Sequence, residues 1–205
     1  MSNRPLLLDL FCGAGGCAVG YHRAGFDVVG VDHKPQPRYP FEFHQADALT
    51  YPLDGFDVIH ASPPCQGYAN VTLWRGDHGD HPRLIEAMRA RLKASGVPWV
   101  MENVRTREIR GDFVLCGSAF GLPVRRHRHF ETSIAPTLVA PCQHRSTDLA
   151  FMHKGERAYA DAMGCTWMSS REAREAIPPA YTEWIGTQLL AALSSHALGA
   201  MKGEP

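Results

Sequence analysis

The chain has 205 residues, 44% of them hydrophobic, and its 21 basic and 21 acidic side chains give a formal net charge of zero. This length suits one α/β domain that buries its own core, and the balanced charge lacks the basic excess of many nucleic-acid-binding chains. Six cysteines without a CxxC pair, a short N-terminal apolar run and no long apolar stretch predict a cytoplasmic, intracellular protein with reduced thiols and no membrane contact.

Short apolar runs alternate with helical segments along the chain. Strands are expected at 6–11, 28–32, 43–46, 56–61, 97–102, 113–115 and 128–131, and helices at 18–24, 83–95 and 181–198. Residues 132–160 are expected to be irregular. The alternation predicts an α/β fold with a doubly wound, mostly parallel sheet, in which ligands bind beyond the carboxyl ends of the strands.

A glycine-rich segment, FCGAGG at residues 11–16, lies between the first strand and the first helix. Glycines let backbone amides approach a ligand and turn tightly into a helix N-terminus. Asp32, 19 residues beyond Gly13, is placed to accept hydrogen bonds from ribose hydroxyls, and Asp47 to accept one from an adenine amino group. No P-loop lysine follows the glycines, which argues against a nucleoside triphosphate. An ordinary βαβ turn with two solvated acids is the alternative.

Two further motifs, SPPCQG and ENV, each follow a buried strand. With them the chain resembles the cytosine carbon-5 methyltransferase family. LDLFCGAGG is similar to the family's cofactor loop, SPPCQG to its nucleophile motif, ENV to its base-binding motif and VRRHRHF to its arginine motif, and these segments follow the family's order through most of residues 6–130. IPPAYTEWIG, residues 177–186, stands in the place of the last family motif.

The resemblance implies a class I S-adenosylmethionine-dependent methyltransferase fold of the Rossmann-like type. Residues 1–130 would form the cofactor-binding and catalytic domain. Residues 131–176 would be a reduced insertion in place of the target-recognition domain, and residues 177–205 a helix that packs back on the catalytic domain. The insertion is only 46 residues long. Low sequence specificity, recognition by a partner chain, or recognition by residues 141–157 all stay open.

The resemblance also implies chemical roles. Cys65 would add as a thiolate to carbon-6 of cytosine, which makes carbon-5 reactive toward the methyl group. Glu102 would neutralise the N3 side of the ring, and Arg128, with Arg126 as a second candidate, would hold O2. Asn103 would orient the loop. The residues expected to bind S-adenosylmethionine are Phe11, Gly13, Ala14, Gly15, Gly16, Asp32, Asp47 and Pro63.

These motifs predict a DNA (cytosine-5-)-methyltransferase that acts on a cytosine flipped out of double-stranded DNA, in a phage or restriction-modification setting. Residues 66–80, with Trp74 and Arg75, form a candidate loop over the base, and a plain surface loop is the alternative. RNA methylation stays open because the SPPCQ form also occurs in the family's tRNA-acting branch. A non-catalytic S-adenosylmethionine- or DNA-binding subunit, a free nucleotide substrate and a modified transferred group also stay open.

Two features need separate consideration: a departure from the family's arginine motif and a group of possible zinc ligands. Val124 stands where the arginine motif usually has glutamine, so the structural hydrogen bonds of that glutamine must be replaced or lost. Four residues of the insertion region have the side chains of zinc ligands: Cys142, His144, His153 and Cys165. Because their spacing matches no standard zinc finger, no metal site is expected, and these residues are assigned to the surface or the core.

Overall fold

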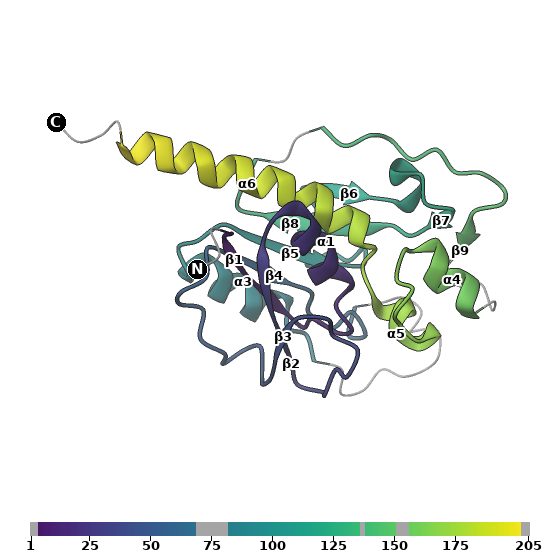
Figure 1. Cartoon of the computed structure of the whole chain (residues 1–205), viewed down its shortest axis with the longest axis horizontal. Coiled ribbons are helices and arrows are strands. Elements are labelled where there is room, and N and C mark those ends of the chain that lie inside the picture. The colour runs from purple at the N-terminus through teal and green to yellow at the C-terminus, as the bar shows by residue number, and fades with distance from the viewer. Residues whose placement is uncertain (1–3, 69–81, 136–137, 151–155, 202–205) are drawn as a thin grey trace.

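The structure, a computed structural model, describes residues 4–68, 82–135, 138–150 and 156–201. Its centre is a seven-stranded sheet with the strand order β3-β2-β1-β4-β5-β8-β6 (Figure 1). The strands are β1 (Leu6–Leu10), β2 (Asp27–Asp32), β3 (Glu42–Gln45), β4 (Val58–Ala61), β5 (Trp99–Asn103), β6 (Phe113–Leu115) and β8 (Arg128–Thr132). Within this sheet the first five strands pair in parallel, and β8 is antiparallel to both β5 and β6. The expected mostly parallel sheet is confirmed.

Helices cover both faces of the sheet. On one face α1 (Gly16–Ala24) packs against α6 (Pro179–Met201), and on the other lies α3 (Ile85–Ala94). Successive residues of β1 serve the two faces, because side chains alternate along a strand: Leu7 joins the core with α1 and α6, and Leu8 joins the core with α3. The C-terminal helix lies where the sequence placed it but is longer, and its far end extends past the sheet (Figure 1).

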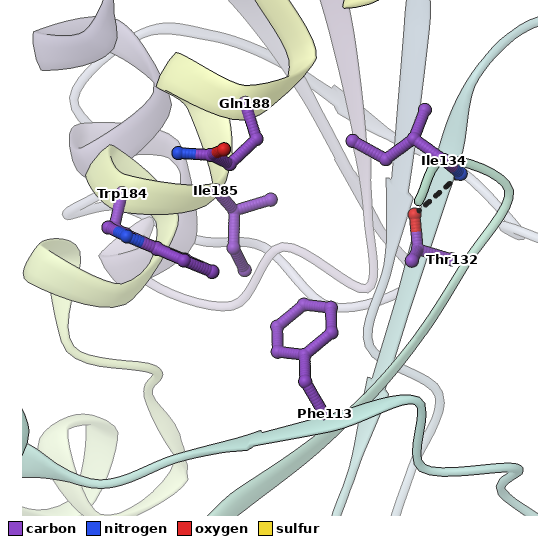
Figure 2. A pocket seen from close by; sticks show the side chains of 6 residues that line it. All are labelled: Phe113, Thr132, Ile134, Trp184, Ile185 and Gln188. Carbon is purple, nitrogen blue, oxygen red and sulfur yellow. Dashed lines mark hydrogen bonds between the residues drawn. The ribbon is translucent and has the colours of Figure 1, made fainter. Parts of the chain in front are cut away.

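A small hollow lies where α6 meets β6 and β8 (Figure 2). Mostly apolar side chains line it: Phe113, Thr132, Ile134, Trp184, Ile185 and Gln188. Its volume of about 10 Å³ has room for about one water molecule and is too small for a nucleoside. The hollow is therefore a small packing gap between α6 and the sheet.

The expectation that residues 132–160 are irregular is partly wrong. The extra elements of the region 117–175 are the 3-10 helix η1 (Gly117–Phe120), β7 (Val124–Arg125), β9 (Leu149–Ala150), α4 (Glu156–Ala162) and α5 (Ser170–Glu175). Strand β9 forms because it pairs in parallel with β7, which lies far from it in the sequence. Tyr159 of α4 and Met163, which directly follows α4, share an apolar cluster with Val124. An apolar contact therefore takes the place of the hydrogen bonds expected from the usual glutamine.

Helix α5 carries a local signal that the sequence analysis did not use. The Ser169 side chain accepts a hydrogen bond from the Glu172 amide, and the Glu172 carboxylate accepts one in return from the Ser169 amide, which is a complete capping box. Within the described residues, no helix combines the length and hydropathy needed to cross a membrane.

Candidate active site

The chemically interesting side chains meet at one edge of the sheet. The glycine loop, Asp32, Cys65 and Glu102 lie at or just after the carboxyl ends of β1, β2, β4 and β5. Strand β8 runs in the opposite direction, so its first residue, Arg128, lies at this same edge and pairs with Leu115 at the end of β6. The edge is where α/β sheets of this type bind ligands.

Glu102 and Arg128 form a pair at the centre of this edge. The Nε atom of Arg128 lies 2.8 Å from Oε1 of Glu102, and Glu102 is only 6% exposed. Among the described residues no donor meets hydrogen-bond geometry at that oxygen. Burial raises the pKa of Glu102, and Arg128, Arg126 and the Ser62 hydroxyl oppose the rise without cancelling it. Glu102 is thus a buried carboxyl group with a raised proton affinity, paired by charge with Arg128.

Cys65 lies within electrostatic reach of this pair. Its side chain is half-buried, at the end of the Pro63-Pro64 segment that follows β4. Burial and the negative charge of Glu102 raise the pKa of the Cys65 thiol, whereas the positive charges of Arg128 and Arg126 lower it. The negative charge of Glu102 therefore disfavours the Cys65 thiolate, and protonation of Glu102 lowers the pKa of the thiol.

Asn103 fixes the loop that carries the cysteine. Its side-chain amide donates a hydrogen bond of 2.9 Å to the carbonyl oxygen of Pro63, and its own oxygen accepts one from the Val104 amide. Both Asn103 and Pro63 are buried. Beyond the cysteine, Tyr68 is held at the N-terminus of α3, because its hydroxyl accepts a hydrogen bond from the Ile85 amide. The geometry gives Asn103 an orienting contact and no open path to a ligand.

Arg126 differs from Arg128 in its surroundings. Its side chain is 1% exposed and donates hydrogen bonds to the Tyr159 hydroxyl (2.9 Å) and to the Arg174 carbonyl (2.7 Å). Burial lowers the pKa of Arg126, and the neighbouring Arg128 lowers it further. Arg125 differs from both, because its side chain is exposed, as on a solvated strand edge. Arg126 connects the region 156–175 to the edge of the sheet where the candidate site lies. Arg128 is the arginine that contacts Glu102.

The glycine loop has the backbone of a ligand-binding turn. Phe11 has a φ of 60°, in the left-handed region, where non-glycine residues are uncommon and mark functional sites. Gly13 has a φ of 49° with no atom within 4 Å of the position that a Cβ would take, so space is open above its backbone. The Gly13 amide donates to the Asp32 carboxylate, 3.1 Å away. Loop and acid therefore lie side by side.

Other residues of the expected cofactor site have less direct support. A Cβ on Gly16 would lie 2.4 Å from the Ile177 carbonyl oxygen, so close packing under α1 already requires this glycine. Gly15 likewise faces the side chains of Tyr39 and Pro40. Asp47 is exposed and accepts a hydrogen bond from the Leu49 amide. The candidate base-covering residues Trp74 and Arg75 lie outside the described residues.

Sequence reasoning missed a buried polar cluster under the glycine loop. Asp9 is fully buried on the α1 side of β1, and among the described residues neither carboxyl oxygen has a hydrogen-bond partner. Burial, and secondarily the negative charge of Asp32, raise the pKa of Asp9 well above its usual range. His60 bridges Cys17, Tyr21 and the hydroxyl of Ser62, the residue that directly precedes the Pro-Pro-Cys segment. A polar residue in the middle of a buried strand was the available signal.

A second missed contact comes from the far end of the chain. The Trp167 indole donates a hydrogen bond of 2.9 Å to the Ala14 carbonyl in the glycine loop. Ala14 also shares a small apolar cluster with Met168 and Ala173. The segment before α5 therefore supports the loop directly, across more than 150 residues of sequence, and local patterns carry no signal for such a contact.

Comparison with known proteins agrees with this architecture. The Dnmt2 methyltransferase of S. pombe superposes with a TM-score of 0.59 over 93% of this chain and 99% of that chain, at 12% identity, which shows a shared fold. The sheet order, with its antiparallel β8 beside β5, defines the Rossmann-like fold of S-adenosylmethionine-dependent methyltransferases. Residues 6–106 match the family described as C-5 cytosine-specific DNA methylase. The chain is thus similar to that family over the part that carries the glycine loop, Cys65 and Glu102.

Curated relatives match over part of their length. Type II methyltransferase M.XorII of Xanthomonas oryzae pv. oryzae is 25% identical over 62% of this chain and 31% of that protein. Type II methyltransferase M1.HphI of Haemophilus parahaemolyticus is 32% identical over 47% of this chain and 32% of that protein. The chain thus spans about a third of the length of these relatives.

Proposed function

We propose that the chain is a DNA (cytosine-5-)-methyltransferase that uses S-adenosylmethionine and forms a covalent bond between Cys65 and carbon-6 of the target cytosine. The observation that carries the proposal is the placement of Cys65, Glu102 and Arg128 at one strand edge, where Arg128 pairs with Glu102 and the charges of both act on the pKa of the Cys65 thiol. The match of residues 6–106 to the C-5 cytosine-specific DNA methylase family supports the same chemistry.

Each of the three side chains has a part in the reaction. The Cys65 thiolate forms a bond to carbon-6, and the displaced electron pair moves into the ring toward carbon-5 and N3. Glu102, whose pKa is raised by burial, supplies a proton or hydrogen bond to N3. Arg128 stabilises the negative charge on the O2 side. After methylation at carbon-5, loss of the carbon-5 proton returns an electron pair to the ring and expels the Cys65 thiolate.

The glycine loop fits S-adenosylmethionine. This cofactor would supply an electrophilic methyl group. Phe11 and the open backbone at Gly13 would lie against its nucleoside. Asp32 is 8% exposed and its carboxylate retains acceptor capacity for ribose hydroxyls, while Asp47 is free to meet a polar edge of the adenine.

We predict that Asp32→Asn weakens S-adenosylmethionine binding. Hydrogen bonds to a charged acceptor are worth about 1.5–3 kcal/mol, so the dissociation constant should rise about ten- to a hundredfold. Isothermal titration calorimetry with the full chain measures this. Asp54→Asn, at an exposed turn, is the matched control and should leave the affinity unchanged. Equal affinity in wild type and Asp32→Asn would remove Asp32 from the cofactor site.

The function itself is tested by offering the wild-type chain S-adenosylmethionine with a labelled methyl group and four separate substrates: duplex DNA, single-stranded DNA, RNA and free cytidine nucleotides. Mass spectrometry of the digested products should find 5-methylcytosine from DNA. Methylation of RNA alone would select the RNA reading, and methylation of nucleotides alone would select a small-molecule enzyme. Cofactor binding without any product would favour an accessory subunit.

Several finer expectations belong with this proposal. The base would be flipped out of the duplex before Cys65 can reach it. A partner chain would supply target recognition if the purified chain methylates cytosines without sequence preference. An enzyme that methylates DNA works in the compartment that contains the DNA, which in a bacterium is the cytoplasm. A phage or restriction-modification setting stays a prediction.

A further inference from the structure

We propose that Cys116, His127, Cys142 and His144 form a structural zinc site beside the arginine motif. The four candidate ligand atoms, two thiol sulfurs and two imidazole nitrogens, all lie within 4.8 Å of one another. They come from three separate segments: the end of β6, the turn between β7 and β8, and the stretch before β9. This differs from the expectation that no metal site exists and that these residues serve only as surface or core.

The distances match a tetrahedron around one metal ion. The Cys116 sulfur lies 3.2 Å from Nε2 of His144, and the Cys142 sulfur lies 3.3 Å from Nε2 of His127. With Zn–S bonds of about 2.3 Å and Zn–N bonds of about 2.1 Å, the edge between a sulfur and a nitrogen in a tetrahedral site is about 3.6 Å. The two imidazole rings meet edge to face, with centroids 5.1 Å apart. The four ligand atoms therefore need only small shifts to hold zinc.

Apart from the cysteine and histidine contacts, few interactions among the described residues hold the segment that carries Cys142 and His144. Residues 140–147 form no helix or strand, and every one of them is exposed. This segment runs along the periphery of the fold between β8 and β9 (Figure 1). One hydrogen bond from the Gln143 amide to the Ser118 hydroxyl joins it to η1. A segment without a core of its own commonly takes a single conformation through a metal or a disulfide.

The ligand chemistry selects zinc. Two thiolates and two imidazoles in tetrahedral arrangement are typical of Zn²⁺ structural sites, and four protein ligands leave no open position for catalysis. A disulfide between Cys116 and Cys142 would not account for a histidine placed against each sulfur. Of the zinc-ligand side chains noted in the sequence, Cys142 and His144 belong to the proposed site. Cys165 is buried in the cluster around α4, and His153 lies outside the described residues.

The site has a consequence for the arginine motif, and this consequence rests on the proposed function. His127 lies between Arg126, which is anchored on α4 and α5, and Arg128, which meets Glu102. A metal bound to His127 fixes the backbone from which Arg128 reaches the carboxyl group. The metal would thereby restrain the backbone of the arginine motif, in which Val124 replaces the usual glutamine and its hydrogen bonds.

Metal analysis of the full-length chain, produced with zinc in the medium and then dialysed, tests the site. We expect about one zinc per wild-type chain, and much less in Cys142→Ser and His144→Asn. The matched control Cys65→Ser removes a thiol outside the cluster and should keep the metal. Replacement of zinc by cobalt(II) should give the visible absorption of a tetrahedral thiolate site in the wild type and lose it in Cys142→Ser.

Thermal unfolding adds a second readout. Cys142 is exposed, so without a metal its replacement by serine should leave the melting temperature nearly unchanged, whereas loss of a bound zinc should lower it by at least about 5 °C. Zinc content equal in wild type and both variants, no stoichiometric metal in the wild type, or a Cys116–Cys142 disulfide found by mass spectrometry would each overturn the proposal. None of these measurements involves DNA or methyl transfer, so this site and the proposed function fail or stand separately.

Discussion

Cys65→Ser should abolish methyl transfer while leaving the fold and cofactor binding intact. A serine hydroxyl does not ionise near neutral pH, so it does not supply the nucleophile that carbon-6 requires, and the rate should fall at least about a thousandfold. The half-buried position of the side chain and the small change in volume make a loss of folding an unexpected outcome. Single-turnover transfer of a labelled methyl group to duplex DNA measures the rate.

Covalent trapping gives an independent readout of the same residue. In DNA that carries 5-fluorocytosine, fluorine replaces the carbon-5 proton whose loss would release the enzyme, so the bond between Cys65 and carbon-6 should survive denaturing electrophoresis. Wild type and Cys165→Ala, which removes a thiol buried near α4, should form this adduct, and Cys65→Ser should not. An adduct of wild-type yield in Cys65→Ser would place the nucleophile elsewhere. Methylation without an adduct in any variant would exclude the covalent route.

The edge that gathers these groups follows from the sequence because parallel strands end on the same side of a sheet. Once residues 6–11, 28–32, 56–61 and 97–102 are assigned as strands, the positions of Asp32, Cys65 and Glu102 follow without any long-range information. Arg128 arrives at this edge only because β8 is antiparallel, and the family resemblance, more than its own hydropathy pattern, placed it there.

Other features depend on contacts that no local pattern encodes. Arg126 and Arg128 are two residues apart, yet Arg126 is buried because Tyr159 and the Arg174 carbonyl meet it from helices that lie 33 and 48 residues further along. The cysteine and histidine cluster forms for a similar reason. The pairing of β7 with β9 brings the segment of Cys142 and His144 back over η1, and the irregular spacing of the ligands hides the site in the sequence.

Glu102→Gln should change turnover and thiol reactivity in opposite directions. Glutamine has no proton to give to N3, so the rate of methyl transfer should fall by roughly 10²- to 10⁴-fold. The wild-type rate should also fall on the alkaline side, where Glu102 loses its proton at a pH raised by burial, and this limb should vanish in the variant. Steady-state rates measured from acid to alkaline pH test both expectations.

The reactivity of Cys65 tests the electrostatic basis of that result without DNA. Burial raises the pKa of the Cys65 thiol most, and the charge of Glu102 raises it further, so removing this charge in Glu102→Gln lowers the thiol pKa and increases the thiolate fraction at neutral pH. Alkylation of the Cys65 peptide by iodoacetamide, followed by mass spectrometry, should therefore be faster in Glu102→Gln than in wild type. It should be slower in Arg128→Gln, which removes a positive charge that lowers the same pKa, and unchanged in Glu42→Gln, on the exposed strand at the other end of the sheet. Equal alkylation rates in Glu102→Gln and Arg128→Gln would show that the charges of these two residues do not set the pKa of the Cys65 thiol, and would contradict the proposed chemistry.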